Sequence, residues 1–539
     1  MERFLHPTAL WRALAPLLLA ARLLASCRCA AAGVTLITHG FELDSSYPGW
    51  VTEMADQIPQ NPSFPGTNFT TYRVTVTYNN GYYVAWSRVN GGPPSATDSG
   101  EILLELDWSQ LSGDLFDSYA STYSAAWPVA WAILQTNLIG ELGGHALAEL
   151  PIHLIGHSRG GSLVSEISRQ LGTNGVWTDQ VTTLDPYPIN NDGNNDFLAS
   201  VVDAPVHTYA SVLFADNYWQ NLGAGFLFGD PDGEPVAGAY ARQLYTLSGG
   251  YDNNHSNVHL WYHGTIDSNT PAGDGSASIT STERQNWWAP YEDRGNVAGF
   301  SYSLIGGGDR LSADQPLGGG FPAINAGYNR RWNLGAGAAN NRSPLSVNNG
   351  GWPNLIRLNQ TSTNPVLQGQ SIPVALYYQW GRTNAGDATV SFYLDDDFNP
   401  LNGNSRLVGQ VAVPGTGPTS VNVATVSLRL DATNAAAGVH ALYATISGGG
   451  RSRCLYAPEL VEVISSQQAP VLDIARLGAG QFGIGVNAVS GQTIVLQAST
   501  RLGNWLPVAT NTFTASRWVY TNNPPAGGTQ QYFRAVLGP

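Results

Sequence analysis

Apolar and polar residues along the first half of the chain predict strands of a parallel sheet that alternate with helices. Val34–Thr38, Pro151–Ile155 and Val181–Leu184 are apolar or β-branched runs typical of buried strands. Residues 162–171 carry a helical pattern directly after the second of these runs, and residues 210–215 predict a further strand. This alternation indicates a doubly wound, mostly parallel α/β sheet in residues 33–270.

The pattern changes after about residue 270. Residues 271–352 are rich in Gly, Asn and Trp and lack helical periodicity, so this loop-rich extension is either packed on the first domain or a structural spacer. Residues 353–464 alternate in strand fashion between regular turn signals, which predicts an immunoglobulin-like β-sandwich. Residues 465–470 have the composition of a linker, and residues 471–539 predict a second, small β module.

One loop of the predicted sandwich has a composition that could indicate a calcium-binding site. Residues 395–404 are rich in Asp and Asn, as calcium-binding loops are. The calcium loop needs Gly at its sixth position, and Pro400 stands there. We therefore expect a solvated hairpin loop and no metal.

The strongest chemical signal lies between the strand and the helix in residues 151–171. Gly156, Ser158 and Gly160 form a G-x-S-x-G pattern, whose glycines permit the sharp turn that lifts a serine hydroxyl clear of the sheet. The bare pattern carries little weight in a chain with 61 Gly. Its position between a strand and a helix predicts Ser158 as a nucleophile.

A nucleophilic serine also needs donors for the developing oxyanion. The first predicted strand ends at His39, Gly40 and Phe41, where glycine allows a close turn under a substrate carbonyl. The N–H groups of Phe41 and of Arg159, the residue after the nucleophile, are therefore expected to form the oxyanion hole.

Two aspartates compete for the role of the acid. Asp185 follows the strand after the elbow helix, at the sheet edge where ligands of open α/β sheets gather. Asp216 ends the next predicted strand, and many hydrolases place their acid there. We favour Asp185, although an aspartate at a strand end can also simply cap a turn.

Three histidines compete for the role of the base. His255, His259 and His263 lie at four-residue spacing and can share one face of a short helix. The spacing also suits a metal, but no Glu stands between the first two, so the helical zinc pattern is absent. His255 follows a polar, turn-rich stretch and is favoured, with His259 as the alternative.

These pieces together resemble the pancreatic-type lipase branch of the α/β-hydrolases. The resemblance is carried by residues 39–41, 105–109, 153–158 and 184–186 and by the His255 segment, in that order. It implies an α/β-hydrolase fold over residues 33–270, a carboxylic ester substrate, and an acid at Asp185. The animal enzymes are held by many disulfides, from which this chain departs because it has three cysteines.

Composition narrows the function further. The formal net charge is −14 and the sequence contains no lysine, so the chain lacks the basic block of a nucleic-acid-binding protein. Cys27 and Cys29 lie in the leader region, which leaves Cys454 without an intrachain partner after processing. We expect no cofactor.

Both ends of the chain indicate export. Residues 1–32 have the basic start, short apolar run and small-residue end of a signal peptide, with a cleavage site after Ala32. Residues 24–27 also resemble a lipoprotein box, which would anchor the protein at Cys27. Residues 498–505 resemble the core of short C-terminal β modules on secreted proteins of some Gram-negative bacteria, for which attachment, sorting or stabilisation are open roles.

The sequence thus predicts a secreted or cell-surface serine hydrolase that acts on carboxylic esters, most simply lipid esters as a lipase, phospholipase A1 or esterase. Its partners would be the ester substrate and, through the C-terminal modules, a cell surface or an insoluble substrate. The alternative is a cell-surface binding or adhesion protein on an inactive hydrolase scaffold, because fold does not guarantee function.

Overall fold

The computed structural model describes residues 32–538 with several gaps. The gaps, which the structure does not describe, are residues 62–67, 114–119, 192–200, 223–231, 267–271, 288–298, 303–341, 348–350, 361–364, 382–385, 419, 466–468, 479–480, 501, 503 and 523–529. The predicted leader therefore lies outside the described residues, except for Ala32. So does most of the predicted extension at 271–352.

The first part of the chain forms an eight-stranded sheet with the order β3-β2-β4-β1-β5-β6-β7-β8. All neighbouring pairs are parallel except β2 and β3, which form an antiparallel hairpin at one edge. The strands are β1 (Val34–Thr38), β2 (Thr70–Tyr78), β3 (Tyr82–Gly91), β4 (Ile102–Asp107), β5 (Ile152–His157), β6 (Thr178–Leu184), β7 (Val212–Gln220) and β8 (Tyr240–Leu244). The predicted mostly parallel sheet is thus present.

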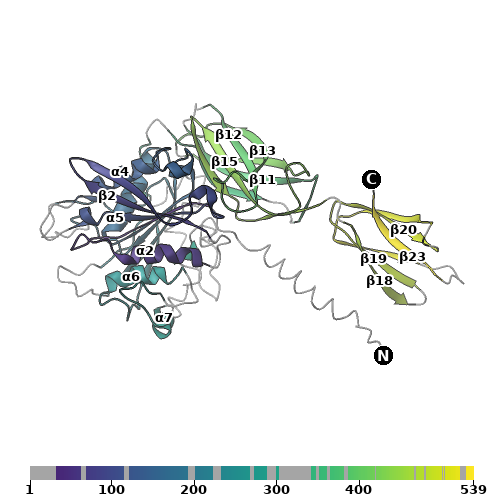
Figure 1. The fold of residues 1–539 in the computed structure, drawn as a ribbon, viewed down its shortest axis with the longest axis horizontal. Helices are drawn as coiled ribbons and strands as arrows, with labels where there is room; N and C mark the ends of the chain where they lie inside the picture. Colours follow the sequence, from purple (N-terminus) through teal and green to yellow (C-terminus); the bar gives the residue numbers. More distant parts are fainter. Residues whose placement is uncertain are drawn as a thin grey trace.

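Helices cover both faces of this sheet, as Figure 1 shows. α4 (Thr122–Ile133) and α5 (Arg159–Thr173) lie on one face, and α2 (Gly49–Gln57), α6 (Asn254–His263) and the short α7 (Ser281–Trp287) lie on the other. The helical segments are completed by α3 (Ser109–Ser112), η1 (Ile58–Gln60), η2 (Pro94–Ala96), η3 (Gly140–Leu142), η4 (Leu147–Glu149) and η5 (Gly299–Tyr302).

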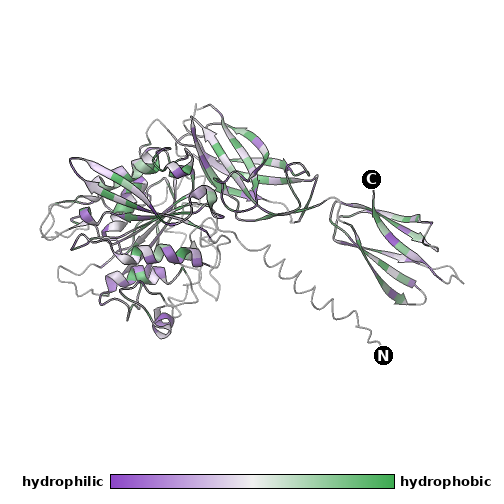
Figure 2. Cartoon of the chain, viewed as in Figure 1, coloured by the Kyte–Doolittle hydropathy of each residue, from purple (hydrophilic) through white to green (hydrophobic). Residues whose placement is uncertain are grey.

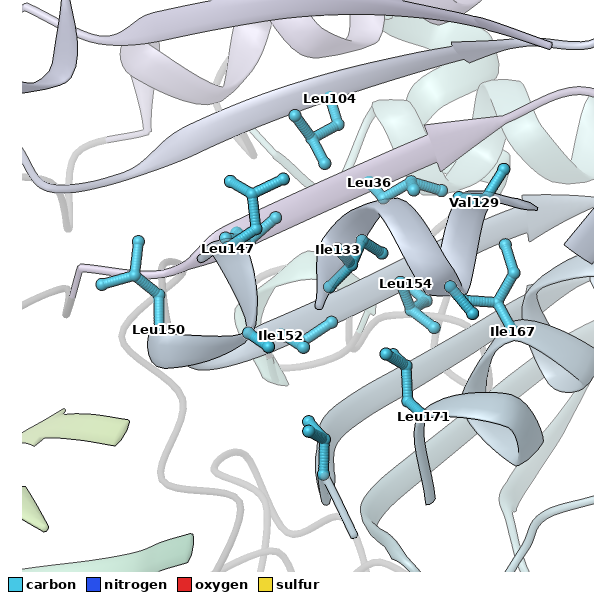
Figure 3. Packing of buried hydrophobic residues seen from close by; sticks show 14 of the residues in the cluster. Leu36, Leu104, Val129, Ile133, Leu147, Leu150, Ile152, Leu154, Ile167 and Leu171 are labelled. Atoms are coloured by element: carbon cyan, nitrogen blue, oxygen red, sulfur yellow. The ribbon is translucent and has the colours of Figure 1, made fainter. Parts of the chain in front are cut away.

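Two apolar clusters fill the spaces between the sheet and its helices. Figure 3 shows the packing of one cluster, in which aliphatic side chains from the strands meet those of α4 and α5. The labelled residues of these elements are Leu36, Leu104, Ile152, Leu154, Val129, Ile133, Ile167 and Leu171. Each such side chain contributes about 1.5–3 kcal/mol to the stability of the fold when it is fully buried. The sheet is therefore held firmly on both faces, and its strands support the residues at their carboxyl ends.

Some element boundaries differ from the sequence prediction. β7 runs to Gln220, five residues beyond the predicted end at Ala215, because its polar residues Asp216 and Asn217 are buried inside the sheet. α7 lies in the extension, where no helical periodicity was expected. The described parts of that extension pack on the α/β part on both sides of the sheet. Trp287 and Phe300 belong to the apolar cluster on the α6 side, and Trp352 belongs to the cluster that includes α4 and α5.

Two sheets that share one apolar core follow the α/β part. The first contains β10 (Val366–Leu367), β17 (Val461–Ile464), β15 (Gly438–Gly448), β12 (Ala388–Asp395) and β13 (Arg406–Val413), with β16 (Arg451–Tyr456) paired to β15. The second contains β14 (Asn422–Arg429), β11 (Ser371–Gln379) and β9 (Asn354–Gln360). Figure 2 shows apolar and polar positions mixed along these strands, as expected for sheets with one buried face.

The sandwich docks against the α/β sheet at the edge where its parallel strands begin. The buried Arg453 of β16 donates to Asp179 Oδ2 at 3.0 Å, to the carbonyl of Leu150 at 3.1 Å and to the carbonyl of Trp177 at 2.7 Å. Asp179 in turn accepts from the N–H of Ile152 at 2.8 Å. Arg453 therefore provides hydrogen-bond donors for the carboxylate and the two carbonyls that lie at the starts of β5 and β6.

The loop at residues 395–404 joins the antiparallel strands β12 and β13, so it is the expected hairpin, but the expectation that it is solvated is wrong for Phe398 and Asn399. Asn399 is fully buried and donates to the carbonyls of Pro94 and Thr97, at 2.6 and 2.8 Å. The carbonyl of Phe398 accepts from the N–H of Gly100 at 2.8 Å. The loop is a contact between the sandwich and the α/β part, which a local residue pattern does not reveal.

The last part of the chain forms two three-stranded sheets around a separate apolar cluster. Their strands are β18 (Val471–Gly478), β19 (Gln481–Asn487), β22 (Arg517–Asn522), β21 (Leu506–Thr512), β20 (Thr493–Ser499) and β23 (Tyr532–Leu537). In the described part of the chain, no helix has the length and apolar character that a membrane span requires.

Candidate active site

Ser158 occupies a strained turn between β5 and α5. Its backbone has φ +58° and ψ −128°, a conformation that costs a non-glycine residue free energy and is held by its surroundings. The N–H of Ser158 donates to the carbonyl of Leu184 at 2.9 Å. A Cβ at Gly156 would lie 2.1 Å from the carbonyl oxygen of Gly160, so the turn requires glycine at that position.

The end of β1 lies directly against this turn. A Cβ at Gly40 would stand 2.5 Å from Ser158 Cβ and 2.9 Å from its Oγ, so the backbone before Phe41 touches the serine. Trp108 supports this segment by donating from Nε1 to the carbonyl of His39 at 3.0 Å. The structure thus places the two segments that carry Phe41 and Arg159 next to Ser158.

Asp185 and His255 are in direct contact. His255 Nδ1 lies 2.8 Å from Asp185 Oδ2, so the imidazole donates from Nδ1 to the buried carboxylate. Asp185 follows β6 with φ +43°. Its two oxygens also accept from Gln220, one from the backbone N–H and the other from the side-chain amide, both at 2.9 Å. This set of donors fixes the carboxylate toward the imidazole.

His157 connects the base to the elbow. His255 lies in the first turn of α6, which begins at Asn254, so the three histidines lie on one short helix that follows the polar stretch. His157, the residue before Ser158, donates from Nε2 to the carbonyl of His255 at 2.9 Å, and the two rings are 4.6 Å apart. The structure therefore brings the His255 ring to the residue adjoining the serine.

The competing residues have other surroundings. Asp216 lies within β7 and accepts from Thr182 Oγ1 at 2.6 Å, and burial raises its pKa to about 7. His259 stacks on Trp50 with ring centroids 4.1 Å apart, and burial, then the neighbouring histidines, hold its pKa well below the ordinary value. His263 is buried, which lowers its pKa to about 4. In this structure it is Asp185 that contacts His255.

Burial keeps several ionisable groups around Ser158 neutral. Desolvation lowers the pKa of His39 to about 4 and that of His157 well below its usual range. Glu42, one residue after Phe41, has its pKa raised to about 8 by burial and by the nearby carboxylates of Asp44 and Asp107. In such surroundings a hydrogen bond to a developing oxyanion is stronger than it is in water.

The side chain of Arg159 has a role that the sequence analysis missed. It is buried and forms a two-pronged ion pair with Asp203, from Nε at 2.6 Å and from Nη2 at 2.8 Å. Asp203 also accepts from the N–H groups of Thr122 and Ile189, at 2.9 and 3.0 Å. The pair thus ties the start of α5 to the start of α4 and to the segment after β6 that contains Ile189, and only the long-range contact reveals it.

Among the described residues, no group of three or more His, Cys, Asp or Glu side chains is arranged to hold a metal ion.

No family profile and no curated protein sequence matches this chain. Among solved structures, two variants of a superoxide reductase (neelaredoxin) from Ignicoccus hospitalis are similar at 17% and 16% identity, each covering 20% of this chain and 80% of the other, with a TM-score of 0.14. A cytokine receptor complex is similar at 14% identity, covering 34% of this chain and 90% of the other, with a TM-score of 0.13.

Proposed function

We propose that this protein is an α/β-hydrolase that cleaves carboxylic esters, in particular lipid esters, through an acyl-enzyme on Ser158. The observation that carries the proposal is the 2.8 Å contact between His255 Nδ1 and Asp185 Oδ2, beside a serine held in a strained strand-to-helix turn. A serine hydroxyl becomes a useful nucleophile only with such a base and orienting acid.

The roles of the three residues follow from their contacts. Asp185 holds the imidazole of His255 in the tautomer that carries hydrogen on Nδ1, which leaves Nε2 as the atom that accepts the serine proton. Ser158 Oγ attacks the ester carbonyl, and the protonated His255 then gives its proton to the leaving alcohol. Water attacks the acyl-enzyme by the same route and releases the acid.

The developing oxyanion would be held by the N–H groups of Phe41 and Arg159. Arg159 is the first residue of α5, and the first N–H groups of a helix lack intrahelical acceptors. The ion pair with Asp203 anchors the Arg159 side chain. Rigid donors of this kind cost little reorganisation when the reaction occurs.

A fluorophosphonate probe tests the proposal without a choice of substrate, because it reacts with an activated serine. The wild-type protein should be labelled and should hydrolyse p-nitrophenyl esters, and Ser158→Ala should lose both properties. Ser162→Ala is a matched control, since Ser162 Oγ is committed to the carbonyl of Ala204 at 2.5 Å. An unlabelled wild-type protein that shows normal folding would favour the binding-protein alternative instead.

We also propose that the protein is exported and acts outside the cytoplasm. The signal-peptide pattern of residues 1–32 supports this, with Cys27 as the alternative point of lipid attachment. The C-terminal module would then attach the enzyme to a cell surface or to an insoluble substrate. Mass determination of the exported protein distinguishes a free chain from an acylated one.

A further inference from the structure

A buried carboxylate without a charged partner lies at the edge of the sheet far from Ser158. Glu101 immediately precedes β4 and is fully buried. Its Oε1 accepts from Thr35 Oγ1 at 2.8 Å, whereas its Oε2 has no hydrogen-bond partner in the part of the chain that the structure describes. An ionised carboxylate in such a place is costly unless a cation pairs with it.

The backbone of Gly33 lies beside this free oxygen. A Cβ at Gly33 would stand 3.0 Å from Glu101 Oε2, and the carbonyl of Gly33 accepts from the N–H of Ile102 at 2.9 Å. Burial raises the pKa of Glu101 well above its usual range, and only the Thr35 hydroxyl and the N–H groups of Gly33 and Thr35 act in the opposite direction. No cation of the described residues contributes.

Gly33 is also the residue that would follow the predicted leader. Hydrolysis of the bond between Ala32 and Gly33 adds the oxygen of water to the Ala32 carbonyl carbon and leaves an α-amino group on Gly33. That amine has an ordinary pKa of about 8 and takes up a proton to become a cation. The cation would arise at the nitrogen that now faces Glu101.

We propose that removal of the leader creates the missing counter-ion, so that the Gly33 α-ammonium and Glu101 form a buried ion pair in the mature protein. Ala32 is itself buried in the apolar cluster, so cleavage has to precede folding of this edge. An uncleaved chain keeps a neutral amide in this place and leaves Glu101 unpaired. The inference rests on cleavage after Ala32 and does not depend on ester hydrolysis.

The absence of lysine makes this pair directly measurable. With no lysine in the sequence, the α-amine of a chain that starts at Gly33 is its sole primary amine. An amine-acylating reagent therefore has one primary amine to modify, and mass spectrometry of the N-terminal peptide counts the product at this amine separately from any acylation of Ser158. A paired, buried ammonium should react at least about tenfold more slowly at pH 7 than the amine of the same chain unfolded in urea, because at a pH below the pKa each unit by which the pKa is raised lowers the free amine about tenfold.

The test uses the full mature chain, residues 33–539, and the same chain with residues 30–32 retained at its start. Each is made with Glu101 and with Glu101→Gln. Asp395→Asn is the matched control, because Asp395 is likewise buried, with a pKa raised to about 7, but lies in the sandwich. The native protein isolated after export is sequenced from its N-terminus.

The proposal predicts an N-terminus at Gly33, slow acylation of wild type, and acylation faster by about tenfold in Glu101→Gln but not in Asp395→Asn. The mature chain should melt on the order of 2–5 °C above the extended chain, and Glu101→Gln should abolish that difference. Wild-type measurements remain decisive if Glu101→Gln does not fold. Acylation of wild type as fast as in urea, an unchanged melting difference in Glu101→Gln, or an N-terminus at Cys27 would each overturn the proposal.

Discussion

Gln220 binds both oxygens of Asp185, with its backbone N–H to Oδ1 and its side-chain amide to Oδ2, each at 2.9 Å. Gln220 is the last residue of β7, and Asp185 directly follows β6. The ends of two neighbouring parallel strands are therefore joined by these hydrogen bonds. The side chain of Gln220 therefore fixes the carboxylate that orients His255.

We predict that Gln220→Leu lowers kcat on a soluble ester by about 10- to 100-fold. A hydrogen bond to a charged group contributes about 1.5–3 kcal/mol, and the carboxylate loses one such bond. Gln180→Leu is the matched control, because Gln180 donates an equivalent amide bond at 3.1 Å to Asp216. Equal losses of kcat in the two folded variants would contradict the positioning role.

Asp185→Asn should lower kcat by about 10⁴-fold, because an amide in place of the carboxylate favours the wrong imidazole tautomer. Asp216→Asn should cost far less, since Asp216 contacts Thr182 and Gln180 within the sheet. Circular dichroism establishes that both variants fold. The opposite ranking of kcat would assign the acid to β7.

Asp216 should also impose a pH dependence on stability. Its pKa is about 7 in the folded chain and about 4 when unfolded, so between these values the folded state holds a proton that the unfolded state lacks. This contribution is fully present below pH 4 and is lost as the pH rises toward 7. Relative to wild type, Asp216→Asn should therefore gain stability from pH 4 to pH 7 and stay level above it. Urea unfolding at several pH values measures this, and a difference independent of pH would contradict it.

Breaking the Arg159–Asp203 pair should strongly destabilise the protein. Asp203→Ala leaves a buried guanidinium without its carboxylate, which costs about 3–5 kcal/mol in comparable cases. The double variant Arg159→Met with Asp203→Leu should be more stable than Asp203→Ala, because it buries no charge. Urea unfolding compares the variants. A double variant no more stable than Asp203→Ala would show that the charge itself is not the cause.

Removal of the last module should leave the catalytic rate intact. A chain that ends at Ser466 retains every proposed site residue and the sandwich contacts of Arg453, so it should hydrolyse a soluble short-chain ester at close to the full-length rate. A chain that ends at residue 352 loses Arg453 and exposes Asp179, and should fail to fold. The first prediction is contradicted if the chain ending at Ser466 folds but is inactive.

The sequence predicted the parts of the site that follow from local pattern. The apolar run before Ser158 and the short strand before Asp185 identified two of the residues now found near one edge of the sheet, and the polar stretch before His255 marked the segment of the third. The true end of β7 was not predictable, because its last residues are polar and nonetheless buried, which hydrophobic periodicity does not detect. Asp216 therefore looked like a strand-end residue although it lies inside β7.

The sequence did not predict contacts between residues that lie far apart in the chain. Gln220, Asp203 and Arg453 act on residues that lie 35, 44 and 274 positions away in the chain. No local spacing connects such residues, and each is an ordinary polar residue in its own segment. Their roles become apparent only when the folded chain brings the segments that carry them into contact.

The docking of Arg453 has a consequence for the order of events during biosynthesis. The α/β part emerges from the ribosome first, but Asp179 and the starts of β5 and β6 must wait for an arginine made much later. An α/β part that closed early would leave Asp179 and the carbonyls of Leu150 and Trp177 without the arginine that binds them. The late arrival of its counter-charge means that this edge of the sheet reaches its final state only after the sandwich has been synthesised and has docked.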